Sequence, residues 1–231
     1  FASWLMRLSA YRRTYALEKR DTMITITEIG LASKILGAVA LAASKDFTRP
    51  QLNSVLVRVR SNVLHVVATN GHVLAHYTGS VESPDVETLL PLDLVEKLAK
   101  ASKKAHEVQI DVETRTARVL PDGVTFTWTH VDAQFPPFES VIPAPAASTL
   151  RTMEGFAIST EYLALAGRMF ALLLDRQKSV GVYLEIPKTD DYAPIVMSSA
   201  SVPNLVLVVM PIRENRSGAR VAPKVKAVKA A

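Results

Sequence analysis

Residues 52–79 read LNSVLVRVRSNVLHVVATNGHVLAHYTG, and the arrangement of apolar residues in this stretch decides the fold. Apolar residues alternate with polar ones in three short runs, and alternation with period two is typical of half-buried strands. The stretch therefore predicts three consecutive strands, with Gly71 at a sharp corner between the last two. His72 follows this corner directly, so the tip is either a plain hairpin turn or the rim of a site.

The same order of elements recurs on both sides of this stretch. A strand pattern at 23–29 and a helical pattern at 31–44 precede it, and strand, helix and three strands start again near 87 and near 153. These starts are about 65 residues apart, which indicates a repeated structural unit. The sequence therefore predicts an α+β fold of three tandem β-α-β-β-β units, with helices on one face and antiparallel sheets on the other. The later elements are expected at 94–104 (helix), 106–113, 116–121 and 123–131 (strands), then 153–159 (strand), 160–174 (helix), 180–186, 194–199 and 204–212 (strands).

These units divide the chain. We expect an N-terminal extension at 1–22, a complete two-unit domain at 23–143, a third unit forming a half domain at 150–213, and a basic disordered tail at 214–231. The connecting segment 132–148 contains four prolines and is expected to be extended. The third unit has no partner unit in the chain, so its sheet edge is expected to be shielded or paired with another molecule.

Composition limits the possible functions. The chain has no cysteine, which excludes disulfide frameworks and thiolate zinc sites and fits a cytoplasmic location. No apolar run reaches the roughly 18 residues that a membrane span needs. The formal net charge of +5 comes from the ends, because residues 23–212 carry 16 Lys or Arg against 19 Asp or Glu. Any contact with DNA therefore has to depend on local positive charge.

Catalytic and metal-binding sites have little support. His72 and His76 are four residues apart, a spacing that suits a metal ion only on a helix. On a strand they share a face but stand roughly 13 Å apart. The sequence has no Gly-rich phosphate loop and no serine elbow. We therefore expect no catalytic residue, no metal ion and no cofactor.

Four segments, in this order, resemble one known family. They are DFTRPQLNSVL (46–56), VVATNGHVLA (66–75), FPPFESVIP (135–143) and VVMPIR (208–213). Together they are similar to the bacterial DNA polymerase III beta subunit, the sliding clamp, and the resemblance covers about residues 23–213. It implies a DNA clamp fold, in which a ring of such units encircles duplex DNA with its helices lining the hole. It also implies a processivity factor of DNA replication that is not an enzyme.

The resemblance further implies a pocket near the carboxyl end for short peptide motifs of DNA polymerases, repair proteins and clamp loaders. Such peptides gain affinity from apolar anchors in a preformed concave site. The matching positions here are Leu52, Thr69, Gly71, His72, Val73, Leu74, Pro136, Val141, Val208, Met210, Pro211, Ile212 and Arg213.

Several positions depart from the family pattern. Asn70 stands in place of an Asp, which keeps the turn chemistry but removes a charge, and Val73 stands in place of an Arg. Pro137-Phe138 replaces Asp-Tyr, and Glu139-Ser140 replaces basic residues. We therefore expect a more apolar rim and a shifted partner specificity.

Sliding on DNA requires basic side chains near phosphates without base readout. Lys97, Lys100 and Lys104 form one stripe of an expected helix, opposite Val95 and Leu98, although a solvated helix face gives the same pattern. The resemblance favours DNA-facing roles for Lys34, Lys45, Arg49, Lys97, Lys100, Lys104, Arg168 and Arg176. At two further positions where the family is basic, this chain has Leu92 and Asp93, which weakens the expected grip on DNA.

The family has six units per chain and this sequence has three, so it is similar to the second domain plus half of the third. A closed ring of twelve units then needs four chains, and we expect self-association with four subunits as the favoured closed form. Two functions remain open. One is a ring that encircles duplex DNA, and the other is a non-encircling interaction module that binds clamp-motif peptides and modulates replication proteins.

Overall fold

The computed structural model describes residues 22–26, 32–101, 107–143, 158–174, 181–185 and 193–211. The helices are α2 (Ala32–Ala40), α3 (Leu92–Ala101) and α4 (Thr160–Leu173). The strands are β1 (Met23–Ile26), β2 (Ser54–Arg60), β3 (Val63–Thr69), β4 (Val73–Ser80), β5 (Val86–Pro91), β6 (Glu107–Asp111), β7 (Thr116–Leu120), β8 (Val124–Thr127), β9 (Tyr183–Glu185), β10 (Ile195–Ser199) and β11 (Val202–Val209). Three predicted segments lie outside these ranges: the N-terminal extension except Thr22, the strand that opens the third unit except residues 158–159, and the basic tail.

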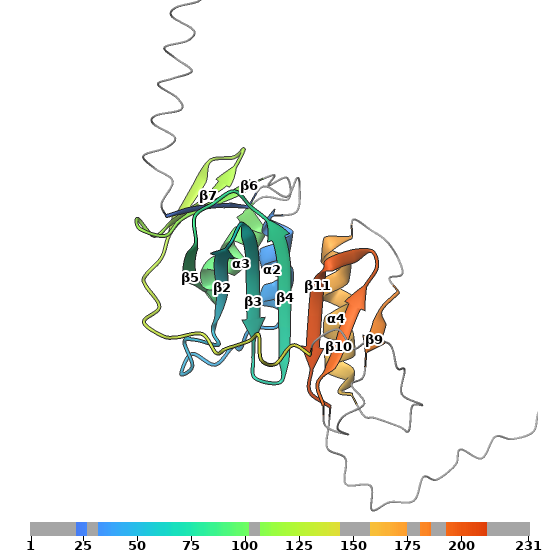
Figure 1. Cartoon of the computed structure of the whole chain (residues 1–231). Helices are drawn as coiled ribbons and strands as arrows, with labels where there is room; N and C mark the ends of the chain where they lie inside the picture. Colours follow the sequence, from blue (N-terminus) through green and yellow to red (C-terminus); the bar gives the residue numbers. More distant parts are fainter. Residues whose placement is uncertain are drawn as a thin grey trace, which may run out of the picture.

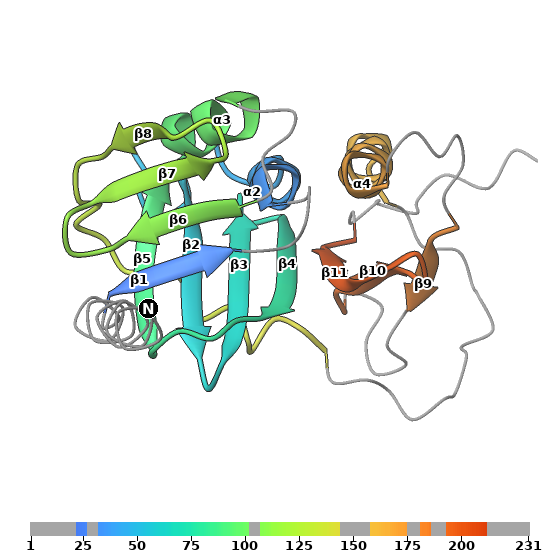
Figure 2. The same cartoon turned by 90° about the horizontal axis from the view of Figure 1, so that it is seen from above.

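The strands form two antiparallel sheets, in the orders β1-β6-β7-β8 and β5-β2-β3-β4-β11-β10-β9 (Figures 1 and 2). Two strands pair with strands from the other half of residues 23–127. β1 pairs with β6 of the later half, and β5 pairs with β2 of the earlier half. Because neither sheet is complete without the exchanged strand, this pairing links the two sheets into one folded body.

Strands β9 to β11 extend the larger sheet. β11 pairs with β4, from Leu205 opposite Tyr77 to Val209 opposite Val73. The expectation that the sheet edge of residues 150–213 is shielded or paired with another molecule is therefore wrong for the β11 edge. The β11 edge is paired with β4 of the same chain, because buried residues of β11 lie opposite buried residues of β4 on both faces of the sheet.

The three helices lie side by side, with α2 between α3 and α4 (Figure 2). Ile35 and Val39 of α2 are buried as the helical pattern predicts. Gly37 allows a close approach to α3, since a Cβ atom at this position would lie 2.9 Å from the Cβ of Ala99. The predicted α+β class, with antiparallel sheets and helices, is confirmed. None of the helices in the described ranges is long and apolar enough to cross a membrane.

The larger sheet buries side chains on both faces. On β2, Val55 and Val57 belong to the main core beneath the helices, whereas Leu56 belongs to a second cluster on the opposite face. That second cluster consists of Leu56, Val67, Leu74, Leu89, Phe135, Phe138 and Val208. Its two phenylalanines come from residues 131–142, which we call the strap.

The strap is the yellow segment that crosses β2, β3 and β4 in Figure 1. The chain leaves the smaller sheet ahead of the strap, because β8 ends at Thr127 rather than at the predicted residue 131. Trp128, which is buried, marks the point where the chain leaves the smaller sheet. The alternating pattern of residues 124–131 is therefore only partly a strand, and its last residues start the crossing to the other sheet.

Candidate functional site

The hairpin between β3 and β4 is held by its own polar groups. The Oδ1 atom of Asn70 accepts hydrogen bonds from the amides of His72 (2.9 Å) and Val73 (3.0 Å). The Oγ1 atom of Thr69 accepts from the amide of Gly71 (3.0 Å) and donates to the carbonyl of Val73 (2.8 Å). Gly71 has a φ angle of 92°, a conformation that favours glycine. The expected turn chemistry of Asn70 is confirmed.

β11 brings a distant part of the chain to this hairpin. Val208 lies opposite Leu74, and Val209 lies opposite Val73. Just beyond the last pair, the amide of Met210 donates a hydrogen bond to the carbonyl of His72 at 3.0 Å. The side chains of Val208 and Met210 consequently lie beside the hairpin tip.

The strap supplies a third wall. Phe135 and Phe138, which are 6% and 2% exposed, anchor it on the outer face of the sheet. Ser140 Oγ donates to the carbonyl of Pro137 at 2.9 Å, and the amide of Val141 donates to the carbonyl of Phe138 at 3.1 Å. These bonds close a turn at 137–141 that directs the strap along the hairpin.

The hairpin, β11 and the strap enclose a cavity of about 250 Å³ with a largely apolar lining. The lining residues are Leu52, Thr69, Gly71, His72, Val73, Leu74, Pro136, Pro137, Phe138, Val141, Val208 and Met210. Val141 and Met210 are 40% and 39% exposed, so the cavity is open to solvent beside them. A concave site of this kind suits apolar side chains of a ligand.

Ten of the thirteen predicted pocket residues line this cavity. Pro211 is half-buried but is not part of the lining, and Ile212 and Arg213 lie outside the described residues. Pro137 and Phe138 are lining residues that the prediction does not include, because the family pattern marks them only as departures. The signal for them is the pair of phenylalanines at 135 and 138 in a proline-rich segment. Proline keeps such a segment extended, and large aromatic side chains gain stability when they are buried on an apolar surface.

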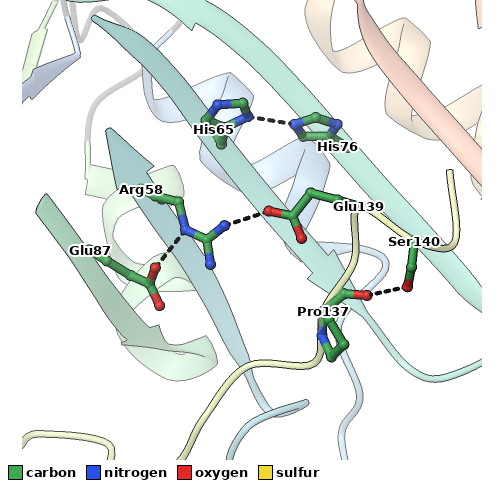
Figure 3. Close-up of polar contacts among 7 residues, drawn as sticks. All are labelled: Arg58, His65, His76, Glu87, Pro137, Glu139 and Ser140. Carbon is green, nitrogen blue, oxygen red and sulfur yellow. Dashed lines mark hydrogen bonds and ion pairs between the residues drawn. The ribbon is translucent and has the colours of Figure 1, made fainter. Parts of the chain in front are cut away.

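An ionic cluster joins the strap to the sheet. Arg58 Nε lies 2.5 Å from Glu87 Oε2 on β5, and Arg58 Nη1 lies 2.6 Å from Glu139 Oε1 on the strap (Figure 3). The guanidinium carbon also lies 5.3 Å from the centroid of the Phe138 ring. The acidic residue at 139, a departure from the family pattern, thus has a partner within the chain.

Two histidines pack beside Phe138. Nδ1 of His65 and Nε2 of His76 are 3.0 Å apart (Figure 3). The His76 ring lies edge-on to Phe138, with centroids 5.1 Å apart. Burial, and then the neighbouring His65, lower the pKa of His76 to about 4. Burial, and then Arg58, lower the pKa of His65. Both rings are therefore neutral at neutral pH, and the N–H of one ring can donate a hydrogen bond to the unprotonated nitrogen of the other.

The predicted DNA-facing residues are spread over the helices and one loop. Lys97 and Lys100 are exposed on α3 opposite the buried Val95 and Leu98, as predicted, but Lys97 pairs with Asp93 (3.1 Å) and Lys100 with Glu96 (3.6 Å). Of the others, Lys34 lies on α2, Lys45 and Arg49 are exposed between α2 and β2, and Arg168 is exposed on α4. Arg49 is 3.7 Å from Asp46. Lys104 and Arg176 lie outside the described residues.

Sequence comparisons point to the family that the four segments resemble. Residues 28–137 match the family model of the DNA polymerase III beta subunit, central domain. The beta sliding clamp of Pseudomonas aeruginosa is 28% identical over 114 residues, which is 48% of this chain and 31% of that protein. The beta sliding clamp of Rickettsia bellii is 25% identical over 127 residues, which is 51% of this chain and 33% of that protein.

Solved structures agree in fold. The DnaN sliding clamp of Pseudomonas aeruginosa bound to griselimycin superposes with a TM-score of 0.61 at 18% identity, over 84% of this chain and 66% of that chain. The DNA polymerase III beta subunit of Thermotoga maritima superposes with a TM-score of 0.56 at 17% identity and the same coverage. The sequence matches to the two beta sliding clamps cover about a third of the length of each of those proteins. The chain is a distant homologue of the bacterial beta sliding clamp, matched over the central domain of that non-enzymatic family.

Proposed function

We propose that this chain is a sliding-clamp-like processivity factor of DNA replication, whose cavity binds short peptide motifs of DNA polymerases, repair proteins or clamp loaders. The main support is the meeting of the hairpin, β11 and the strap around one apolar cavity. A linear peptide gains affinity when its apolar anchors enter a preformed site. All thirteen predicted pocket residues belong to the proposal, including Ile212 and Arg213, which closely follow Met210 in the sequence.

We further propose that the elements form three tandem β-α-β-β-β units, with a two-unit domain at 23–143 and a half domain at 150–213. The extension at 1–22 and the basic tail at 214–231 flank them. In this arrangement α2, α3 and α4 face duplex DNA, and the exposed basic residues on and beside them contact phosphates without reading bases. A protein that meets replication enzymes in a bacterium acts in the cytoplasm, and that location is part of the proposal.

Encirclement requires several copies, and we propose self-association with four subunits as the closed form. The β9 end of the larger sheet supports an intermolecular contact, because Tyr183 is 61% exposed and its neighbours Val182 and Leu184 are also exposed. Native mass spectrometry with and without duplex DNA gives the subunit number. A strict monomer in light scattering at tens of micromolar would contradict self-association.

The alternative is a non-encircling module that binds clamp-motif peptides and modulates replication proteins. It is favoured by the pairing of Lys97 and Lys100 with carboxylates on the same helix, which reduces the positive charge available to phosphates. The excess of acidic residues between 23 and 212 points the same way. Both functions use the same cavity, so the cavity is tested first.

The test compares wild-type protein with Met210→Ala and, as a control, Val124→Ala. Both side chains are about equally exposed, at 39% and 40%, but Val124 lies on β8, away from the cavity. The probes are griselimycin, to which the similar Pseudomonas aeruginosa clamp is bound in its crystal structure, and a fluorescently labelled peptide with apolar side chains. Truncation of an apolar contact at the site is expected to weaken binding about tenfold, whereas the control leaves it unchanged.

Isothermal titration and fluorescence anisotropy measure these affinities. Wild-type protein that binds neither probe would contradict both functions. Equal affinities of wild-type protein and Met210→Ala would contradict the assignment of the cavity.

A further inference from the structure

The strap forms one wall of the cavity, yet its ionic attachment to the sheet depends on a single side chain. Among the described residues, the ion pair between Arg58 and Glu139 is the one that joins the strap to the sheet. Within the part of the chain that the structure describes, the other side-chain hydrogen bond of the strap runs from Ser140 to Pro137 and stays within the strap itself. Arg58 does not line the cavity. Its effect on the cavity therefore has to pass through the strap.

Arg58 is oriented independently of the strap. Glu87 lies directly opposite Arg58 in the β2–β5 pair, and its carboxylate binds Nε at 2.5 Å. The Arg58 side chain is only 18% exposed, whereas Glu139 is 56% exposed. Because a guanidinium group has a planar arrangement of donors, fixing Nε also fixes the direction of Nη1. The sheet thus presents an aimed donor to the strap.

The two contacts of Arg58 with the strap fall on neighbouring residues. Its guanidinium group lies over the ring of Phe138, and its Nη1 atom binds the carboxylate of Glu139. Phe135 and Phe138 hold the strap on the apolar outer face, but neither ring by itself fixes the rotation of the chain between Pro137 and Val141. A second contact at Glu139 fixes the orientation of the chain on both sides, where Pro137 and Val141 face the cavity.

We propose that Arg58 is a positioning residue of the peptide cavity: by holding Glu139 and Phe138, it sets the strap wall at the distance from the hairpin that a ligand requires. This inference rests on the proposed function of the cavity. Figure 3 shows the arrangement, with Arg58 between Glu87 on one side and Glu139 on the other. The substitution of a basic residue by Glu139 is then part of how this chain builds its own pocket.

The test uses Arg58→Met, Arg58→Lys, Glu139→Gln and the double variant Arg58→Met/Glu139→Gln in the full chain. With griselimycin and the labelled peptide as probes, Arg58→Met and Glu139→Gln are each expected to bind about fivefold more weakly. Arg58→Lys keeps the charge but lacks the planar pair of donors, so it is expected to recover only part of the affinity. The double variant is expected to be no weaker than either single variant, because both remove the same contact.

Arg60→Met is the matched control. Arg60 is exposed on the same strand two residues away, so it shares the face of Arg58 but has no contact with the strap among the described interactions. A purely structural role of Arg58 would lower thermal stability without changing affinity in the temperature range where the protein is folded. Additive losses in the double variant would overturn the proposal, as would unchanged affinity in Arg58→Met.

A second measurement separates this inference from the proposed function. The ring of Phe138 packs edge-on against His76 with centroids 5.1 Å apart, so the NMR shifts of the His76 imidazole protons report the seating of the strap. Arg58→Met is expected to move these shifts and Arg60→Met to leave them unchanged. If wild-type protein binds neither probe, the proposed function fails and the shifts alone decide whether Arg58 positions the strap. Shifts that Arg58→Met leaves unchanged overturn the inference.

Discussion

The amide of Met210 donates a hydrogen bond to the carbonyl of His72 at 3.0 Å. This bond joins the carboxyl end of β11 to the hairpin between β3 and β4, two segments that are far apart in the sequence. It places Met210 and Gly71 at the same cavity. The cavity therefore exists only when β11 is paired with β4, and its geometry is sensitive to changes in each of the three segments that enclose it.

Gly71→Ala is expected to destabilise the protein through backbone strain alone. A Cβ atom at Gly71 would meet nothing within 4 Å, but the φ angle of 92° disfavours any residue that has one. We expect a loss of about 1–2 kcal/mol in the free energy of unfolding. Urea denaturation measures this change.

Gly167→Ala is the matched control for this substitution. Gly167 also has open space around its Cα but lies within helix α4, where alanine is favoured. A gain of up to about 1 kcal/mol is expected. If both variants changed stability in the same direction, the strain assigned to the hairpin corner would be wrong.

Phe138→Ala is expected to cost about 3 kcal/mol in the free energy of unfolding, because the ring is fully buried against the outer face of the sheet. The same variant should lose affinity for the cavity probes, since Phe138 is part of the lining. Phe47→Ala, at an 85% exposed position, should change stability by less than about 0.5 kcal/mol. A small effect at both positions in chemical denaturation would mean that the strap is not anchored on the sheet.

Stability is expected to fall as the pH is lowered from about 6.5 towards 4. The folded protein holds the pKa of His76 at about 4, below its ordinary value of 6.5, so the unfolded chain binds more protons between these values. The free energy of unfolding therefore rises with pH through this window and levels off above it. The full difference corresponds to about 3 kcal/mol. The lowered pKa of His65 acts in the same direction.

Denaturation series at several pH values measure this dependence. His76→Gln should flatten the curve between pH 4 and 6.5, because it removes the histidine whose pKa burial lowers to about 4. His130→Gln, at an exposed position outside the pair, controls for the loss of a histidine as such. A curve that keeps its slope in His76→Gln would show that other groups cause the acid sensitivity.

Lys97→Glu/Lys100→Glu distinguishes the two proposed functions. Under encirclement, reversing two charges on the exposed face of α3 should reduce retention on circular DNA about tenfold or more at low salt. Binding of the cavity probes should stay unchanged, because neither lysine lines the cavity. Circular dichroism checks that the helix remains intact.

Arg118→Glu on β7 serves as the charge control for this experiment, because it is exposed on the smaller sheet rather than on a helix. A non-encircling module would show no retention on circular DNA in the wild-type protein and no effect of either change. Loss of retention in Arg118→Glu to the same extent would point to a general charge effect rather than to α3.

Local sequence determined the strands and helices of this protein and much of the hairpin. The alternation in residues 54–79 predicts β2, β3 and β4 closely, and Asn70-Gly71 specifies the turn between the last two. These features follow from backbone preferences and from the period of apolar residues, which act over a few positions. The resemblance of four segments to the sliding clamp adds ten of the residues that line the cavity.

Only the tertiary structure decided how these pieces meet. It pairs β11 with β4, lays the strap over the outer face of the larger sheet and brings Arg58 to Glu139 across 81 positions of sequence. It also ends β8 early, although the alternation continues to residue 131. Such contacts depend on the fit of apolar surfaces and charges from separate segments, and no pattern within one segment records which distant surface it will cover.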